Sequence, residues 1–69
     1  MIANDEELQV TLDRVADFQA QVMHLRKLIA DAETYRHSAG GFLAEIERMQ
    51  QEVRAYLKQH PSELAASAH

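Results

Sequence analysis

Length, composition and charge exclude several classes of protein. The chain has 69 residues, so it forms one domain at most, and it has no cysteine, which excludes disulfides and thiolate metal sites. Its formal charge is −4, from 11 acidic and 7 basic side chains. This charge argues against a nucleic-acid or anionic-membrane surface, and it suits either a basic protein partner or simply solubility. No apolar run is long enough to span a membrane. Because Asp5, Glu6 and Glu7 occupy the place of a signal peptide, we expect a cytoplasmic protein.

The first residues allow two interpretations of where the first helix begins. Asn4 followed by Glu7 has the spacing of a capping box, which predicts a helix from this point. Alternatively, residues 8–12 alternate between apolar and polar, as a short extended segment does, and Thr11 is the N-cap. We favour Thr11, because threonine is a poor choice for the core position that it would otherwise occupy.

Residues 11–32 are predicted to form the first helix. This segment contains no glycine or proline, which favours a helix. Its apolar side chains recur at alternating spacings of three and four residues, as in a heptad repeat. The stripe consists of Val15, Phe18, Val22, Leu25, Ile29 and Ala32. Leu12 and Leu28 flank this stripe and make it wider than two-stranded packing requires.

Residues 34–59 are predicted to form the second helix, with Thr34 as its N-cap. The same alternating spacing produces a second stripe, which consists of Tyr35, Ala39, Phe42, Ile46, Met49, Val53 and Tyr56. Leu43 and Leu57 widen it. Pro61 ends the helix, and residues 61–69 are expected to form a flexible tail.

The two stripes are out of phase with each other, which predicts a reversal of the chain. Ala32 and Tyr35 would occupy the same heptad position, yet they are three residues apart and not seven. The turn has two candidate places, residues 31–37 and Gly40-Gly41. Glycines are the stronger breaker signal, and each costs about 1 kcal/mol inside a helix. The second stripe continues through them, however, which favours the turn at 31–37.

These features predict an all-α fold, an antiparallel two-helix hairpin over residues 1–60. A core of this size contributes only roughly 3–5 kcal/mol, and each stripe is too wide for one neighbouring helix to cover. We therefore expect a homodimer that closes a four-helix bundle. Its shared core and interface are predicted to comprise Val15, Phe18, Val22, Leu25, Ile29, Tyr35, Phe42, Ile46, Met49, Val53 and Tyr56.

Patterns of catalytic or ligand-binding residues are weak in this sequence. A carboxylate metal site in a helical bundle uses Glu-x-x-His, whereas Glu33 and His37 are four residues apart and fall in the predicted turn. No serine stands in a Gly-x-Ser-x-Gly motif, and no phosphate-binding loop is present. Arg26, Lys27 and Arg36 form the one basic cluster. Because the second helix is long and acidic in its middle, direct DNA binding is not expected. We predict a non-enzymatic protein without a cofactor or metal.

Residues 35–63 follow a YRxSxGGFLAEIxRMxxEVxxYLxxHPSE pattern. In this they resemble a family of short, uncharacterised bacterial helical proteins. Residues 4–11, followed by Ala16 and Phe18, are similar to the helical segment that precedes the DNA-binding domain in Xre-type antitoxin regulators. In that group the segment supplies helical packing. The resemblance implies an accessory of a toxin–antitoxin or regulatory system.

The function predicted from the sequence is that of a small protein-interaction or oligomerisation module. A second possibility is a subunit of a larger helical assembly, in which the apolar stripe meets an obligate partner chain. A carboxylate and histidine metal protein is the third and weakest possibility.

Overall fold

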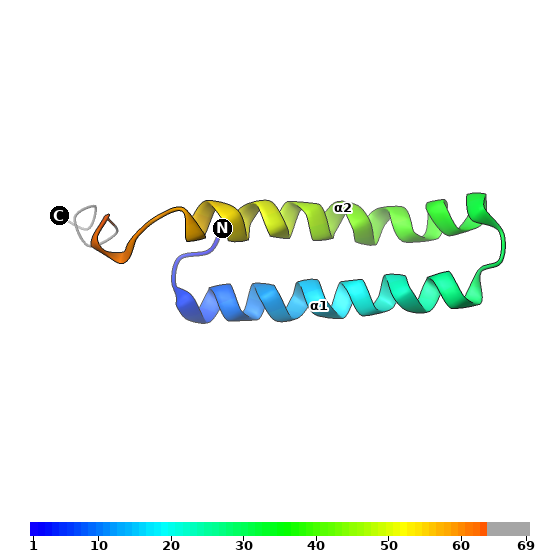
Figure 1. Ribbon diagram of the computed structural model, residues 1–69, viewed down its shortest axis with the longest axis horizontal. Coiled ribbons are helices and arrows are strands. Elements are labelled where there is room, and N and C mark those ends of the chain that lie inside the picture. The colour runs from blue at the N-terminus through cyan, green and yellow to red at the C-terminus, as the bar shows by residue number, and fades with distance from the viewer. Residues whose placement is uncertain (64–69) are drawn as a thin grey trace.

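The computed structural model describes residues 1–63, and it confirms the predicted antiparallel hairpin of two helices (Figure 1). Helix α1 spans Asp5–Leu28 and helix α2 spans Ala32–Leu57. No strand occurs in the described part of the chain, so the fold there is all-α. No helix among residues 1–63 combines the length and apolar character needed to cross a bilayer.

Helix α1 begins at Asp5, so the predicted start at Thr11 is wrong. Asn4 is the N-cap, because its side-chain oxygen accepts the backbone N–H of Glu7 at 2.9 Å. The Glu7 carboxylate in turn accepts the backbone N–H of Ala3 at 2.9 Å, which resembles a capping box. Thr11 lies inside the helix, where its hydroxyl donates to the Glu7 carbonyl oxygen at 2.9 Å. A threonine can therefore remain helical here with its hydroxyl satisfied.

The turn consists of residues 29–31, at the near edge of the earlier of the two predicted places. Helix α1 consequently ends at Leu28 and not at residue 32. The N-cap of α2 is Asp31, not Thr34 as predicted. The Asp31 carboxylate accepts both the backbone N–H and the hydroxyl of Thr34, each at 2.8 Å. These bonds favour the ionised form, so they lower the pKa of Asp31.

Gly40 and Gly41 lie inside α2, so the alternative turn at these residues is wrong. Neither has a positive φ, and a Cβ atom built on either would meet nothing within 4 Å. Neither the backbone conformation nor a neighbouring side chain of the hairpin therefore requires glycine here.

Helix α2 ends at Leu57, two residues before its predicted end, and residues 61–63 form a short helical turn. The Glu63 backbone N–H donates to the His60 carbonyl oxygen at 2.9 Å in this turn. Residues 64–69 of the predicted flexible tail lie outside the described residues.

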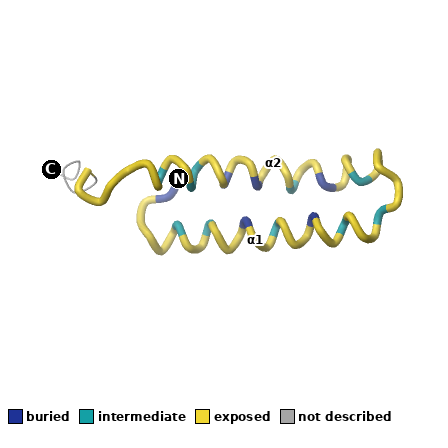
Figure 2. The backbone as a smooth tube through the Cα atoms, in the orientation of Figure 1, coloured by how far each residue is buried: buried dark blue, intermediate teal, exposed yellow. Residues whose placement is uncertain are grey.

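The core is a single layer of apolar side chains between the two helices. In Figure 2 the buried and half-buried positions of each helix lie on the side that faces the other helix. Its buried members come from both stripes and are Val15, Val22, Ala39, Ile46 and Met49. At mid-length the rings of Phe18 and Phe42 meet edge to face, with their centroids 5.6 Å apart. Ile2, which precedes α1, is also buried, with 9% of its surface exposed. The burial of Ile2 was not predicted, because this residue stands outside both periodic stripes.

Replacing Gly40 or Gly41 with alanine is expected to stabilise the protein. Each change should raise the free energy of unfolding by about 0.5–1 kcal/mol, since alanine loses less backbone entropy in a helix. Denaturant unfolding monitored by circular dichroism measures this difference. A loss of stability would contradict the open surroundings of these two residues.

The Asp31 cap is expected to make stability depend on acidic pH. Since its pKa is lowered by folding, its contribution is present above the unfolded pKa, near 4, and disappears as pH falls through the lower folded value. Asp31→Ala should lower the melting temperature at pH 7. Asp31→Asn should keep the cap yet lose this component of the acid dependence. Thermal melts between pH 7 and pH 2 compare the three proteins, and identical acid profiles for wild type and Asp31→Asn would refute the assignment.

Candidate interaction surface

Two helices leave the predicted core and interface only partly covered. Four of its residues, Val15, Val22, Ile46 and Met49, are buried. The others are half-buried: Phe18, Leu25, Ile29, Tyr35, Phe42, Val53 and Tyr56. Among residues 1–63, no large side chain is fully buried. The apolar layer is thus open to water along the two flanks of the hairpin, which have different chemistry.

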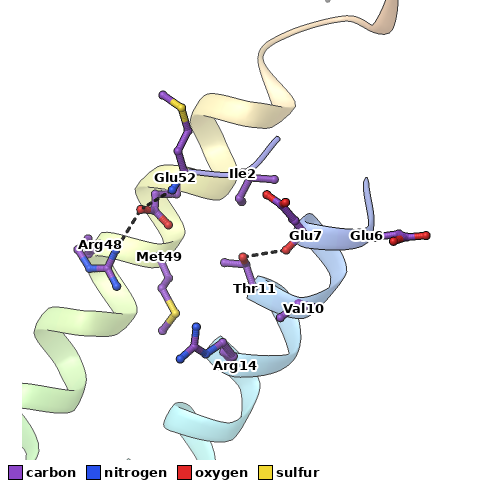
Figure 3. Close-up of a pocket in the computed structure, with 10 residues that line it drawn as sticks. Ile2, Glu6, Glu7, Val10, Thr11, Arg14, Arg48, Met49 and Glu52 are labelled. Carbon is purple, nitrogen blue, oxygen red and sulfur yellow. Dashed lines mark hydrogen bonds and ion pairs between the residues drawn. The ribbon is translucent and has the colours of Figure 1, made fainter. Parts of the chain in front are cut away.

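The charged flank consists of Arg14 on α1 and of Glu45, Arg48 and Glu52 on α2. Arg14, Arg48 and Glu52 are labelled in Figure 3. The Arg48 guanidinium donates to Glu45 at 2.7 Å and to Glu52 at 3.0 Å, along one face of α2. The bond from Arg48 lowers the pKa of Glu45, and the Arg14 charge on the opposite helix adds to this effect. The charges of this flank are therefore largely balanced within the hairpin.

A shallow depression of about 420 Å³ lies on the charged flank (Figure 3). Ile2 and Met49 contribute apolar surface to it, and Arg14, Arg48 and Glu52 contribute charged groups. The chain's terminal ammonium lies 3.6 Å from Glu52. Because acidic and basic groups alternate around this depression, it offers no concentrated charge to a small ion.

The leucine flank lies on the opposite side and consists of Leu12, Leu43 and Leu57. Leu43 and Leu57 each stand four positions after a residue of the second stripe, and Leu12 stands four positions after the half-buried Leu8. The three leucines therefore share one heptad position. In an antiparallel pair of helices this position lies on the same side of both helices. Their exposed fractions are 41%, 47% and 63%. Asp5 of α1 and Leu57 of α2 line one depression at the open end of the hairpin. The leucine flank is thus an exposed apolar surface to which both helices contribute.

Tyr56 joins the two helices at the open end of the hairpin. Its hydroxyl donates to the Asp5 carboxylate at 2.6 Å, across 51 positions of sequence. The same bond raises the pKa of Tyr56, because the neighbouring carboxylate disfavours the phenolate. A tyrosine at the rim of an apolar layer requires such a partner for its hydroxyl.

The residues considered for metal binding or catalysis do not converge. Glu33 and His37 both lie on α2 and not in the turn, and both are exposed. No group of three or more potential metal ligands occurs within residues 1–63. His60 lies 2.8 Å from the Ser62 hydroxyl, but the same ring nitrogen accepts the Ser62 backbone N–H at 3.1 Å. This pair therefore caps the turn at residues 61–63. Ser67 and His69 lie outside the described residues.

Comparison with known proteins does not identify a function for this surface. No family model matches the sequence, and neither the curated proteins nor the solved structures contain a significant match. The family resemblance of residues 35–63 accordingly stays a prediction from the sequence, and the role of this surface is argued below from its residues.

Proposed function

We propose that this chain is a non-enzymatic interaction module that pairs with a second copy to form a four-helix bundle. The half-covered core carries the proposal, because seven stripe residues, including both phenylalanines, stay half-buried in the lone hairpin. Stable domains enclose their apolar layer between packed elements on all sides. Covering these side chains contributes about 25 cal/mol for each Å² of apolar area removed from water.

The leucine flank is the side on which the second copy would lie. Burying Leu12, Leu43 and Leu57 is favourable, whereas covering the charged flank would remove water from Arg48 and its two glutamates. In a four-helix bundle each helix contacts two neighbours. The core stripe of each helix makes the contact within the hairpin, and the leucine flank would make the contact with the second copy.

The small size of the chain adds support. With 69 residues and no cysteine, the chain lacks the disulfides that often stabilise small domains. Association then supplies part of the folding free energy, and the stability of such a protein depends on its concentration.

For the biological role, we propose an accessory of a toxin–antitoxin or regulatory system. The resemblance of residues 4–11, with Ala16 and Phe18, to the helical segment of Xre-type antitoxin regulators supports this role. The net charge of −4 suits a basic protein partner of the assembled bundle.

The proposal predicts a particle of twice the chain mass of 7.8 kDa in light scattering. Leu43→Gln should raise the dissociation constant at least tenfold, since a buried leucine is worth about 1.5–3 kcal/mol and the dimer contains two copies. Leu28→Gln is the matched control. Leu28 is more exposed, at 66%, and lies on the same side of α1 as Arg14, so its replacement should leave the affinity unchanged.

Other outcomes of the mass measurement separate the alternatives. A lone chain that is unfolded at every concentration would favour an obligate partner of different sequence on the leucine flank. A compact, well-folded monomer at low micromolar concentration would contradict both kinds of assembly.

A further inference from the structure

We infer that the second copy docks antiparallel along α1, so that the two α1 helices of the dimer lie against each other about a two-fold axis near Ala16. The inference rests on the proposed dimer and adds the arrangement of its helices. Two observations carry it: a second repeating stripe on α1, and the charges at the two ends of that stripe.

The second stripe of α1 repeats at spacings of four and three residues along the whole helix. Its members are Asp5, Gln9, Leu12, Ala16, Gln19, Met23 and Arg26. At 100° per residue, this stripe lies about 100° around the helix from the core stripe, as a second contact in a four-helix bundle requires. Leu12 and Met23 are 41% and 59% exposed, and they flank the exposed Ala16. A small residue at the centre lets a second helix approach closely.

The ends of this stripe carry opposite charges. Asp5 and Glu6 lie in the first turn of α1, and Arg26 and Lys27 lie in its last turn. Within residues 1–63, no ion pair involves Glu6, Arg26 or Lys27. An antiparallel copy centred on Ala16 brings Asp5 opposite Arg26 and Glu6 opposite Lys27. Because the interface is two-fold symmetric, each pair forms twice.

The other symmetric arrangement is the alternative outcome of the tests below. If the two hairpins docked with their turns at the same end, α1 would face the α2 helix of the second copy. Glu6 and Lys27 would then meet residues of α2 and not each other, and the two copies of residue 16 would lie on diagonally opposite helices. The double charge exchange and the cross-link at residue 16 therefore distinguish the two arrangements.

The helix dipole offers a competing explanation for the charges. Acidic residues in the first turn and basic residues in the last turn stabilise a single helix. The two explanations make opposite predictions for a double charge exchange, because the exchange worsens the interaction with the dipole but keeps the pairing between copies.

Charge reversal at Glu6 and Lys27 tests the inference by measuring dimer dissociation constants. Glu6→Lys and Lys27→Glu should each weaken the homodimer about tenfold, since each turns two attractions into repulsions. A mixture of the two variants should form the heterodimer preferentially. The chain that carries both changes should recover most of the wild-type affinity, whereas the dipole explanation makes this chain the weakest.

Cross-linking tests the position of the two-fold axis independently. The chain has no cysteine, so a single cysteine reports only on its own neighbours. Ala16→Cys should yield a covalent dimer on oxidation, because the two-fold axis brings the two sulfurs within bonding reach. Gln21→Cys is the control: Gln21 is exposed on α1 and lies seven residues after Arg14, on the charged flank away from the second copy, and it should not cross-link.

The outcomes separate this inference from the proposed function. If the wild type is a dimer that neither reversal weakens, or if Ala16→Cys does not cross-link in that dimer, then the arrangement is wrong and the dimer stands. If the wild type is a folded monomer, both proposals are overturned.

Discussion

The hairpin depends on two apolar stripes that face each other, and they do so only because the chain reverses within residues 29–31. Phe18 on one helix and Phe42 on the other meet edge to face at mid-length, and this contact aligns the stripes along their length. The Asp31 cap starts α2 at the position that keeps this alignment.

This packing also explains why the two flanks differ. An antiparallel pair places equivalent heptad positions of both helices on the same side. One side therefore collects Arg14, Glu45 and Glu52, while the other collects Leu12 and Leu43. The charges on one side are balanced by ion pairs within the hairpin. The leucines on the other side stay exposed, because no part of the hairpin covers them. The proposed assembly follows from this asymmetry and not from the total apolar content of the chain.

The hairpin was predictable from the sequence, whereas its boundaries and caps were not. Periodicity identifies a stripe over many residues, but a cap depends on one or two hydrogen bonds. Thr11 was misread because its hydroxyl can bond to the Glu7 carbonyl within the helix. Asp31 and Thr34 can both cap a helix, and only the geometry shows which one accepts. The opposite charges at the two ends of α1 could not be predicted from a helix that starts at Thr11. Asp5 and Glu6 belong to the first turn only because the helix begins at Asp5.

The phase difference between the stripes also bears on how the protein can misassemble. A hairpin with a short connection can exchange arms with a neighbour if its turn straightens into one continuous rod. Here a straightened rod would turn its two stripes about 60° apart, because Ala32 and Tyr35 are only three residues apart at 100° per residue. Both stripes could then not lie along one straight partner without local overwinding, so the offset that forms the fold also disfavours the exchange of arms.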